Sequence, residues 1–466
     1  MASLAGLLKA AGHAVTGSDE NVYPPMSHEL DALGIPYHSG FASANLEPRP
    51  DIVIVGNAIS RGNVELEAAL DNKLRYTSAA AVIKEEFIRG RHSLAVAGTH
   101  GKTSMSSLLA WVLEAAGLNP AFLIGGVAEN FGRSFRLTDS KYFVIEADEY
   151  DTAYFDKGPK MWHYLPDTAI VANIEFDHAD IYRDAIAYNF AFARFINLVP
   201  RNGTLVAGWD SPIVRELAAK SLAPVESFGF SGDERAATDG PHPRWRAENM
   251  QFGPAGTTFT AVHDGAEWGR VESPLAGAFS VRNILAVIAA AESVGADRAR
   301  VREGLRTYKS VKRRMEVRGE ARGVTVIDDF AHHPTAIRET IAAARQKYAG
   351  RRLVAVYEPR SYTAQLKEFE GAYESAFGEA DEVVLAGLFH PERYAGNALD
   401  PGALVDRWNR AGKKAGYIPL VPEIVSTLAR SLGPGDVVLV MSNGGFGGLH
   451  EKLLQALGER SKQAAG

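Results

Sequence analysis

The stretch Ser93-Leu-Ala-Val-Ala-Gly-Thr-His-Gly-Lys-Thr-Ser104 decides how the chain around it folds. Its apolar residues 94–97 predict a buried strand, residues 98–101 a tight turn, and the apolar spacing from Lys102 a helix that stops at Gly117. A strand that runs through a glycine loop into a helix points backbone amides at one place, and this geometry holds phosphate. We expect Lys102 to add positive charge for the outer phosphates and the Thr103 hydroxyl to bind Mg²⁺.

The composition is that of an ordinary globular protein and excludes several functional classes. A length of 466 residues is enough for about three domains. The chain has 56 acidic and 50 basic residues, and its net charge of −6 argues against a nucleic-acid partner. It has no cysteine, which excludes disulfides, a thiolate nucleophile and Cys-ligated zinc. We find neither an apolar run long enough to span a membrane nor an export signal, so we expect a cytoplasmic protein with no membrane partner.

Residues 1–91 are predicted to form a compact α/β unit. The leucine spacing in residues 1–12 predicts a helix, and Ala14-Val-Thr16 predicts a short strand that ends at Gly17. Residues 51–56 form a second apolar strand, and the loop after such a strand is where open α/β sheets bind ligands. Candidate donors to a nucleotide or diphosphate in that loop are Asn57, Ser60 and Arg61, although a solvated turn explains these residues equally well.

Two strands predicted in residues 92–310 end in polar residues. An apolar strand from Tyr142 runs into the acidic segment Glu146-Ala-Asp-Glu-Tyr-Asp151. Buried carboxylates are costly without a cation, so Glu146 is expected to hold Mg²⁺, the alternative being a solvated acidic loop. Residues 169–178 repeat the change from apolar to polar and end in His178, which either binds a second metal ion or is merely hydrogen-bonded. A loop and an alanine-rich helix with Asn283 near its start are predicted for residues 277–291.

Residues 311–466 again alternate strands and helices. Strands are predicted from Val324, Leu353, Glu382 and Asp436, and their polar carboxyl ends could build one crevice. The segment Asp328-Asp-Phe-Ala-His-His333 can be interpreted as a metal site, but no other ligand set with suitable spacing supports this, so we favour substrate contacts. The loop 442–448 indicates either a second anion site or a tight entry into a helix.

Four motifs in this order resemble those of the Mur ligase family. They are Gly-Thr-His-Gly-Lys-Thr at 98–103, Glu-Ala-Asp-Glu-Tyr-Asp at 146–151, Asn-Ile-Glu-Phe-Asp-His at 173–178 and Asp-Asp-Phe-Ala-His-His-Pro at 328–334. The family consists of ATP-dependent enzymes that form peptide bonds in bacterial cell-wall synthesis. The resemblance covers nearly the whole chain and implies an α/β fold of three domains on mostly parallel sheets. These would be a Rossmann-like UDP-sugar-binding domain (1–91), a P-loop-type ATP-binding domain (92–310) and a Rossmann-like domain for the peptide acceptor (311–466).

One branch of the family is favoured by residues 22–26, 56–63, 122–126, 357–361 and 441–448. That branch attaches the recycled tripeptide L-alanyl-γ-D-glutamyl-meso-diaminopimelate to UDP-N-acetylmuramate. The alternative within the family is addition of free L-alanine to the same UDP-sugar. A non-catalytic nucleotide-binding protein is the alternative from another class, and the intact set Lys102, Thr103, Glu146 and His178 argues against it.

The resemblance also implies roles for individual residues. ATP would phosphorylate a carboxylate, and the acceptor amine would then displace the phosphate. The catalytic group would be Lys102, Glu146 and His178, with Thr103, Glu146 and His178 at the magnesium sites. ATP would be bound by Gly98, Thr99, His100, Gly101, Lys102, Thr103, Ser104, Asn283, Arg314 and Asp329. The acceptor would contact His332, Arg360, Ser442 and Asn443.

The amino terminus departs from the family pattern. In the family, a first strand and a glycine-rich turn bind the UDP diphosphate and precede the first helix. Residues 1–12 of this chain already have the spacing of that helix. We therefore expect the natural protein to have roughly 15 to 20 further residues upstream, enough for one strand and its loop.

Overall fold

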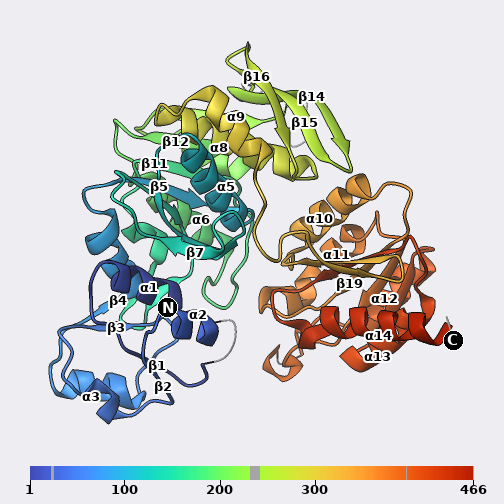
Figure 1. Ribbon diagram of the computed structural model, residues 1–466, viewed down its shortest axis with the longest axis horizontal. Coiled ribbons are helices and arrows are strands. Elements are labelled where there is room, and N and C mark those ends of the chain that lie inside the picture. Colours follow the sequence, from blue (N-terminus) through green and yellow to red (C-terminus); the bar gives the residue numbers. More distant parts are fainter. Residues whose placement is uncertain (23–25, 231–241, 395, 465–466) are drawn as a thin grey trace.

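The computed structural model describes residues 1–22, 26–230, 242–394 and 396–464, and residues 23–25 of the stretch 22–26 lie outside this range. Within it the chain forms three α/β domains in sequence order, drawn from blue to red in Figure 1. None of the helices in these described segments combines the length and the apolar character needed to cross a membrane.

The amino-terminal domain is built on two separate pairs of parallel strands. β1 pairs with β2 and β3 pairs with β4, and no ladder joins the two pairs within the described residues. Its elements are α1 (Ala2–Ala10), β1 (Gly17–Asp19), α2 (Met26–Ala32), β2 (Tyr37–Ser39), β3 (Val53–Val55), α3 (Val64–Asp71), β4 (Tyr76–Ser78), α4 (Ala79–Val82) and a π-helical turn (Ile83–Ile88). The predicted helix over residues 1–12 is confirmed. The strand predicted at Ala14–Thr16 is wrong, because pairing with Tyr37–Ser39 sets the start of β1 at Gly17.

The central domain contains a ten-stranded sheet in the order β16-β15-β14-β13-β12-β11-β5-β8-β6-β7. The strands from β14 through β11 and β5 to β6 run parallel, while β15, β16 and β7 pair antiparallel at the two edges. The strands are β5 (His92–Ala97), β6 (Ala121–Ala128), β7 (Arg133–Arg136), β8 (Tyr142–Glu146), β11 (Thr168–Val171), β12 (Thr204–Gly208), β13 (Val225–Gly229), β14 (Trp245–Gly253), β15 (Gly256–His263) and β16 (Ala266–Ser273), beside the hairpin β9 (Asp151–Ala153) and β10 (Asp156–Pro159). The helices are α5 (Lys102–Ala115), α6 (Ala185–Ile196), α7 (Pro212–Ala218), α8 (Ala278–Ser293) and α9 (Arg298–Arg306).

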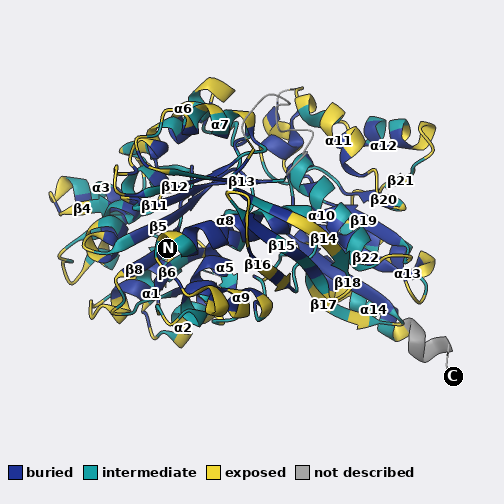
Figure 2. Cartoon of the chain, turned by 90° about the horizontal axis from the view of Figure 1, so that it is seen from above, coloured by how far each residue is buried: buried dark blue, intermediate teal, exposed yellow. Residues whose placement is uncertain are grey.

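Alternation along the strands divides the central core into two layers. Leu94 and Val96 of β5 pack with α5, α8 and α9, whereas Ala95 and Ala97 pack in the layer that contains α6 and α7. Figure 2 shows the buried strands between these helical layers. The leucines of α1 join the second layer, and α1 lies against β7, where Gly6 approaches the ring of Phe135. The first helix therefore attaches the amino-terminal domain to the central sheet.

The carboxyl-terminal domain has a six-stranded sheet in the order β17-β18-β22-β19-β20-β21, parallel except for the β17–β18 pair. Its strands are β17 (Glu316–Ala321), β18 (Val324–Asp329), β19 (Leu353–Tyr357), β20 (Glu382–Leu385), β21 (Lys414–Tyr417) and β22 (Val437–Met441). Its helices are α10 (Pro334–Lys347), α11 (Glu370–Ala376), α12 (Pro401–Arg410), α13 (Val421–Ser431) and α14 (Leu449–Ala464). α10 contacts α8 and β14, so this helix joins the domain to the central one.

Candidate active site

The loop between β5 and α5 has the geometry that the sequence predicts. Gly101 precedes α5 at the N-cap with φ of +85°, a left-handed conformation that glycine adopts without strain. A Cβ at Gly101 would lie 3.1 Å from Oδ1 of Asn283, so glycine also allows the close approach of α8. The loop joins a buried strand to the amino end of a fourteen-residue helix, where free amides and the helix dipole favour an anion.

Lys102 is held inside this loop by two kinds of acceptor. Its Nζ donates to the carbonyl of Gly98 at 2.7 Å and lies 2.7 Å from Oε2 of Glu149. Burial alone would lower the pKa of Lys102, but the carboxylates of Glu149 and Asp148 raise it above its ordinary value. The side chain is therefore a fixed positive charge beside the loop amides.

Glu149 is a site residue that sequence reasoning missed. Its side chain has no exposed surface, and Oε1 accepts from Nζ of Lys102 at 2.9 Å and from the hydroxyl of Tyr188 at 3.2 Å. The same Oε1 lies 3.1 Å from Nε2 of His178. Glu149 belongs to the acidic segment that begins at Glu146, so the sequence contains a signal, but spacing alone does not tell which carboxylate of this segment turns toward Lys102.

Thr103 and Glu146 form a second polar pair at the start of α5. The Thr103 hydroxyl donates to Oε1 of Glu146 at 2.9 Å, and the Gly125 amide donates to Oε2 at 2.7 Å. Burial raises the pKa of Glu146 despite the nearby charge of Lys102, which is the response of a carboxylate that lacks a full counter-charge. A hydroxyl and a carboxylate are hard oxygen donors, so these two residues fit Mg²⁺.

His178 faces the lysine side of the site. Burial alone would lower the pKa of His178, but the hydrogen bond to Glu149 and the charge of Asp177 raise it. The backbone at His178 is left-handed, with φ of +56°, and its amide donates to Oδ1 of Asp177 at 2.7 Å. The metal-ligand role predicted for His178 stays a prediction.

A pocket adjoins the phosphate loop between the central and carboxyl-terminal domains. Its lining includes His100, Gly101 and Asn283 of the predicted ATP set, together with residues that were not predicted: Ala172, Asn173, Glu175, Asp210, Phe228, Phe279, Arg282, Thr335 and Glu339. Asn173 accepts from the backbone amide of His100 at 2.8 Å and so fixes the loop. The apolar rings and amide groups beside the loop suit a purine base next to its phosphates.

Arg314, Asp329 and Ser104 also belong to the predicted ATP set, but they do not line this pocket. Nη2 of Arg314 donates to the Thr103 hydroxyl at 3.4 Å. This residue of the linker between the domains therefore contacts the polar pair of Thr103 and Glu146. The carboxylate of Asp329 accepts from the amides of Met315 and Ala331 at 2.8 Å each, and burial raises its pKa. The carbonyl of Ser104 accepts from Tyr308 at 3.3 Å. Arg314 thus reaches the loop, whereas Asp329 is bound to the backbone of its own domain.

Ser442, Asn443 and Arg360 gather at the carboxyl ends of β22 and β19. The Ser442 hydroxyl donates to Glu358, and Nη1 of Arg360 lies 3.8 Å from the same carboxylate. Oδ1 of Asn443 is buried and has no hydrogen-bond partner among the residues that the structure describes. Arg313, another residue missed by sequence reasoning, donates to the carbonyls of Ser442 and Gly444 at 2.7 Å each and fixes the loop 442–448.

His332 contacts the central domain. Its Nε2 is 3.8 Å from Oδ2 of Asp177 in the central domain, and its Nδ1 is 3.1 Å from the carbonyl of Phe330. The neighbouring His333 packs against His100, with ring centroids 4.7 Å apart. Burial and the neighbouring His100 lower the pKa of His333 to about 3, so this imidazole is neutral. Both histidines therefore lie at the junction between two domains.

The predicted UDP-sugar residues are on the surface of the amino-terminal domain. Asn57, Ser60 and Arg61 are exposed in the loop after β3. Arg61 donates from Nε and Nη2 to Glu67 at 2.9 and 3.0 Å, so its guanidinium is paired. Their role in binding the sugar nucleotide stays a prediction.

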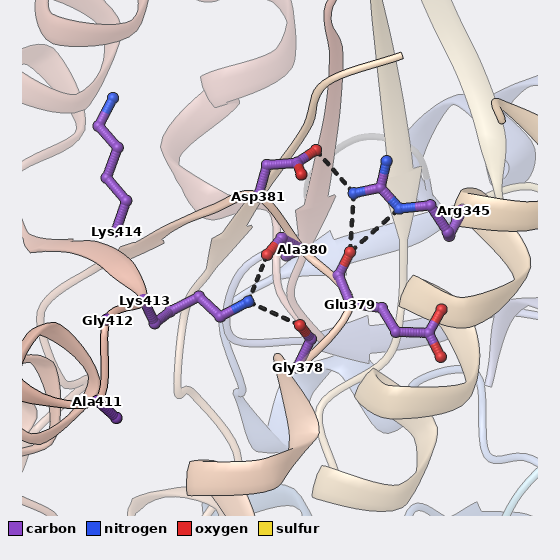
Figure 3. A pocket seen from close by; sticks show the side chains of 9 residues that line it. All are labelled: Arg345, Gly378, Glu379, Ala380, Asp381, Ala411, Gly412, Lys413 and Lys414. Carbon is purple, nitrogen blue, oxygen red and sulfur yellow. Dashed lines mark hydrogen bonds and ion pairs between the residues drawn. The ribbon is translucent and has the colours of Figure 1, made fainter. Parts of the chain in front are cut away.

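A second pocket, with a volume of about 510 Å³, lies at the edge of the carboxyl-terminal sheet. Figure 3 shows that the side chains of Lys413 and Arg345 are directed at neighbouring backbone and acidic groups. Lys413 donates to the carbonyls of Gly378 and Ala380 at 2.7 and 2.6 Å, and Arg345 lies 2.7 Å from Asp381. These contacts stabilise a loop junction, and the predicted site residues do not line this pocket.

The sequence matches three domain families along its length. Residues 1–90 match the Mur ligase family, catalytic domain; residues 96–291 match the Mur ligase middle domain; and residues 313–444 match the Mur ligase, glutamate ligase domain.

Individual relatives match over almost the entire chain. The UDP-N-acetylmuramate–L-alanyl-γ-D-glutamyl-meso-2,6-diaminoheptandioate ligase of Escherichia coli K12 is 40% identical and covers 100% of this chain and 97% of its own length. A UDP-N-acetylmuramate–L-alanine ligase of Salinibacter ruber is 31% identical and covers 98% of this chain and 92% of its own length. The crystal structure of a murein peptide ligase from Psychrobacter arcticus is 35% identical, with a TM-score of 0.71 over 98% of this chain and 96% of that one. The chain therefore belongs to the Mur ligase family of ATP-dependent, amide-forming ligases.

Proposed function

We propose that this protein joins the tripeptide L-alanyl-γ-D-glutamyl-meso-diaminopimelate to the carboxylate of UDP-N-acetylmuramate at the expense of ATP. The observation that carries the proposal is the group formed by Lys102, Thr103 and Glu146 at the amino end of α5. The full-length identity to the Escherichia coli relative, which is named for this reaction, supports the choice of substrates. ATP and a UDP-activated sugar as substrates support a cytoplasmic location.

The proposed reaction proceeds in two chemical steps. A carboxylate oxygen of UDP-N-acetylmuramate attacks the γ-phosphorus of ATP, the bond to the bridging oxygen breaks, and ADP leaves with an acyl phosphate formed. The α-amine of the tripeptide then attacks the acyl carbon, loses a proton, and expels inorganic phosphate as the amide forms. Positioning and charge neutralisation are the main demands on the protein.

The residues of the site have distinct roles in this proposal. Lys102 and the loop amides bind the outer phosphates and stabilise charge on the transferred group. Thr103 and Glu146 would hold Mg²⁺, which neutralises phosphate charge, and His178 would serve a second magnesium site. Asn283 and the pocket beside the loop would take the base, with Arg314 and Asp329 on the carboxyl-terminal side.

The acceptor would occupy the crevice at the ends of β19 and β22. Arg360 offers a guanidinium for a carboxylate of the tripeptide. Oδ1 of Asn443, which is buried without a hydrogen-bond partner among the described residues, offers an acceptor for an ammonium or amide group. Ser442 and His332 complete the proposed acceptor set, and Asn57, Ser60 and Arg61 the sugar-nucleotide set. We propose domain limits of 1–91, 92–310 and 311–466, which assign each of the two large sheets to one domain.

The test measures phosphate release with UDP-N-acetylmuramate and Mg-ATP, with either the tripeptide or L-alanine as acceptor. We expect strong preference for the tripeptide, because a long acceptor with several carboxylates suits the Arg360 crevice. Equal or faster release with L-alanine would replace the proposal with the L-alanine-adding activity for which the Salinibacter relative is named. Release with neither acceptor would refute both.

A further inference from the structure

Two histidines and one glutamate meet where the central and carboxyl-terminal domains touch. His100 comes from the loop before α5, Glu175 from the segment after β11, and His333 from the N-cap of α10. Nε2 of His100 lies 3.1 Å from Oε2 of Glu175, and Nδ1 of His333 lies 3.6 Å from the same oxygen. All three donor atoms lie within 4.8 Å of one another. A search of the described residues for three or more His, Asp or Glu side chains close enough to share a metal ion finds this group.

Two of the three separations between the donor atoms are close to those of a tetrahedral metal site. With metal–ligand bonds of 2.0–2.1 Å, two ligands of a tetrahedral zinc ion are about 3.3 Å apart. The two measured separations of 3.1 and 3.6 Å lie on either side of that value. Two imidazoles and one carboxylate are donors that zinc and its neighbours in the transition series prefer, whereas magnesium prefers oxygen alone.

We propose that His100, Glu175 and His333 bind a divalent transition-metal ion of the zinc class, which ties the carboxyl-terminal domain to the central domain beside the nucleotide pocket. This site uses none of the residues assigned to magnesium, namely Thr103, Glu146 and His178. It also goes beyond the proposed ligase reaction, since the ion has a structural role between domains.

Two of the three side chains are partly exposed beside the phosphate loop. The side chain of Glu175 is 35% exposed and that of His100 15% exposed, whereas His333 is 9% exposed. His100 and Glu175 also line the pocket beside the loop, so the fourth position opens toward it. At present Nδ1 of His333 accepts from the amide of Thr335 at 3.3 Å, a long hydrogen bond. The metal ion would bind the lone pair of Nδ1 in place of the Thr335 amide.

Metal binding is tested on the full-length chain after treatment with a chelator. Zinc is titrated by calorimetry and cobalt by its visible spectrum, in which tetrahedral coordination gives strong absorption bands. We expect one tight zinc per chain and a rise in melting temperature on its addition. Single substitutions His100→Ala, Glu175→Gln and His333→Ala should each weaken zinc affinity at least tenfold and abolish the rise in melting temperature.

The controls separate this site from other metal-binding groups. His390→Ala changes an exposed histidine that lies 2.8 Å from the carboxylate of Glu392, and should leave zinc affinity unchanged. Glu146→Gln tests whether zinc occupies the proposed magnesium site instead. Glu175→Gln keeps the shape of the side chain, and circular dichroism verifies that each variant is folded.

Three results would each overturn the proposal. They are no stoichiometric zinc binding, zinc affinity that is unchanged in the three variants, and zinc affinity that is lost in Glu146→Gln. Zinc binding is measured without ATP or acceptor, so its failure would leave the proposed ligase reaction untouched.

Discussion

Nζ of Lys102 lies 2.7 Å from Oε2 of Glu149, whose side chain has no exposed surface. Because Glu149 also contacts Nε2 of His178, a single buried carboxylate connects the phosphate loop to the Asp177-His178 segment. A buried carboxylate is stable only with its charge compensated, so Glu149 fixes the direction of both side chains. The carboxylate thereby positions the lysine beside the loop amides.

Lys102→Ala is expected to reduce the turnover number about 10²- to 10³-fold, because it removes a preorganised positive charge from the phosphate site. The measurement is phosphate release with saturating tripeptide and Mg-ATP. Lys157→Ala is the matched control, since Lys157 is an exposed lysine paired with Asp151 at 2.6 Å. Near-normal turnover in Lys102→Ala would refute the phosphate-loop assignment.

Glu146→Gln is expected to raise the half-saturating Mg²⁺ concentration at least tenfold, because an amide oxygen is a weaker ligand than a carboxylate. The measurement is turnover as a function of free Mg²⁺ at fixed ATP. Asp151→Asn changes a carboxylate of the same acidic segment and should leave the Mg²⁺ requirement unchanged. If the half-saturating Mg²⁺ concentration rises equally in both variants, the loss of any negative charge in this segment explains the effect, and Glu146 is not a Mg²⁺ ligand.

Gly444→Ala is expected to raise the KM for the tripeptide about tenfold, the value of one charge-assisted hydrogen bond. A Cβ at Gly444 would lie 2.2 Å from Cδ of Arg360, so the guanidinium must move. The melting temperature should change little, because an arginine side chain is flexible. Gly445→Ala in the same loop is the control. The φ angle at Gly445 is −76°, and a Cβ there would have no heavy atom within 4 Å apart from its own residue and its chain neighbours. An unchanged KM in Gly444→Ala would exclude Arg360 from the acceptor site.

Asp328→Asn is expected to destabilise the protein at pH 7 by about 1.5 to 3 kcal/mol, because it removes the charge of a buried carboxylate that lies 3.3 Å from Nε2 of His450 and 3.3 Å from Nε of Arg313. Burial alone would raise the pKa of Asp328, but His450 and Arg313 hold it below its ordinary value of 3.8. A depressed pKa contributes stability above about pH 4, and this contribution is lost as the pH falls through the folded-state value.

The measurement for Asp328 is the free energy of unfolding between pH 7 and pH 3. It should fall less steeply with decreasing pH in Asp328→Asn than in the wild type. Asp406→Asn, at an exposed position on α12, should follow the wild-type curve. Parallel curves for Asp328→Asn and wild type would show that this carboxylate does not contribute to acid unfolding.

Local patterns in the sequence predicted several of the buried strands, but not β6, β7 or β12 to β16 of the central sheet. The apolar runs at β5, β8, β18, β19, β20 and β22 all form strands, and the helix predicted from Lys102 ends before Gly117. Buried parallel strands read as continuous apolar runs, which makes them visible without knowledge of their partners. The error at Ala14–Thr16 has the opposite cause, since β1 is short, partly exposed and defined by its pairing with β2.

The sequence by itself determined the phosphate loop, because Gly98 to Ser104 are consecutive and their backbone geometry is local. Only the tertiary structure decided which groups the side chains of Asp328, Asp329 and His333 contact. Adjacent residues of a strand point to opposite faces, so Asp328 meets His450 while Asp329 accepts backbone amides. His333 caps α10 and reaches His100 and Glu175 of another domain. Such a contact depends on how two domains pack, and no spacing within a single segment of the sequence can encode it.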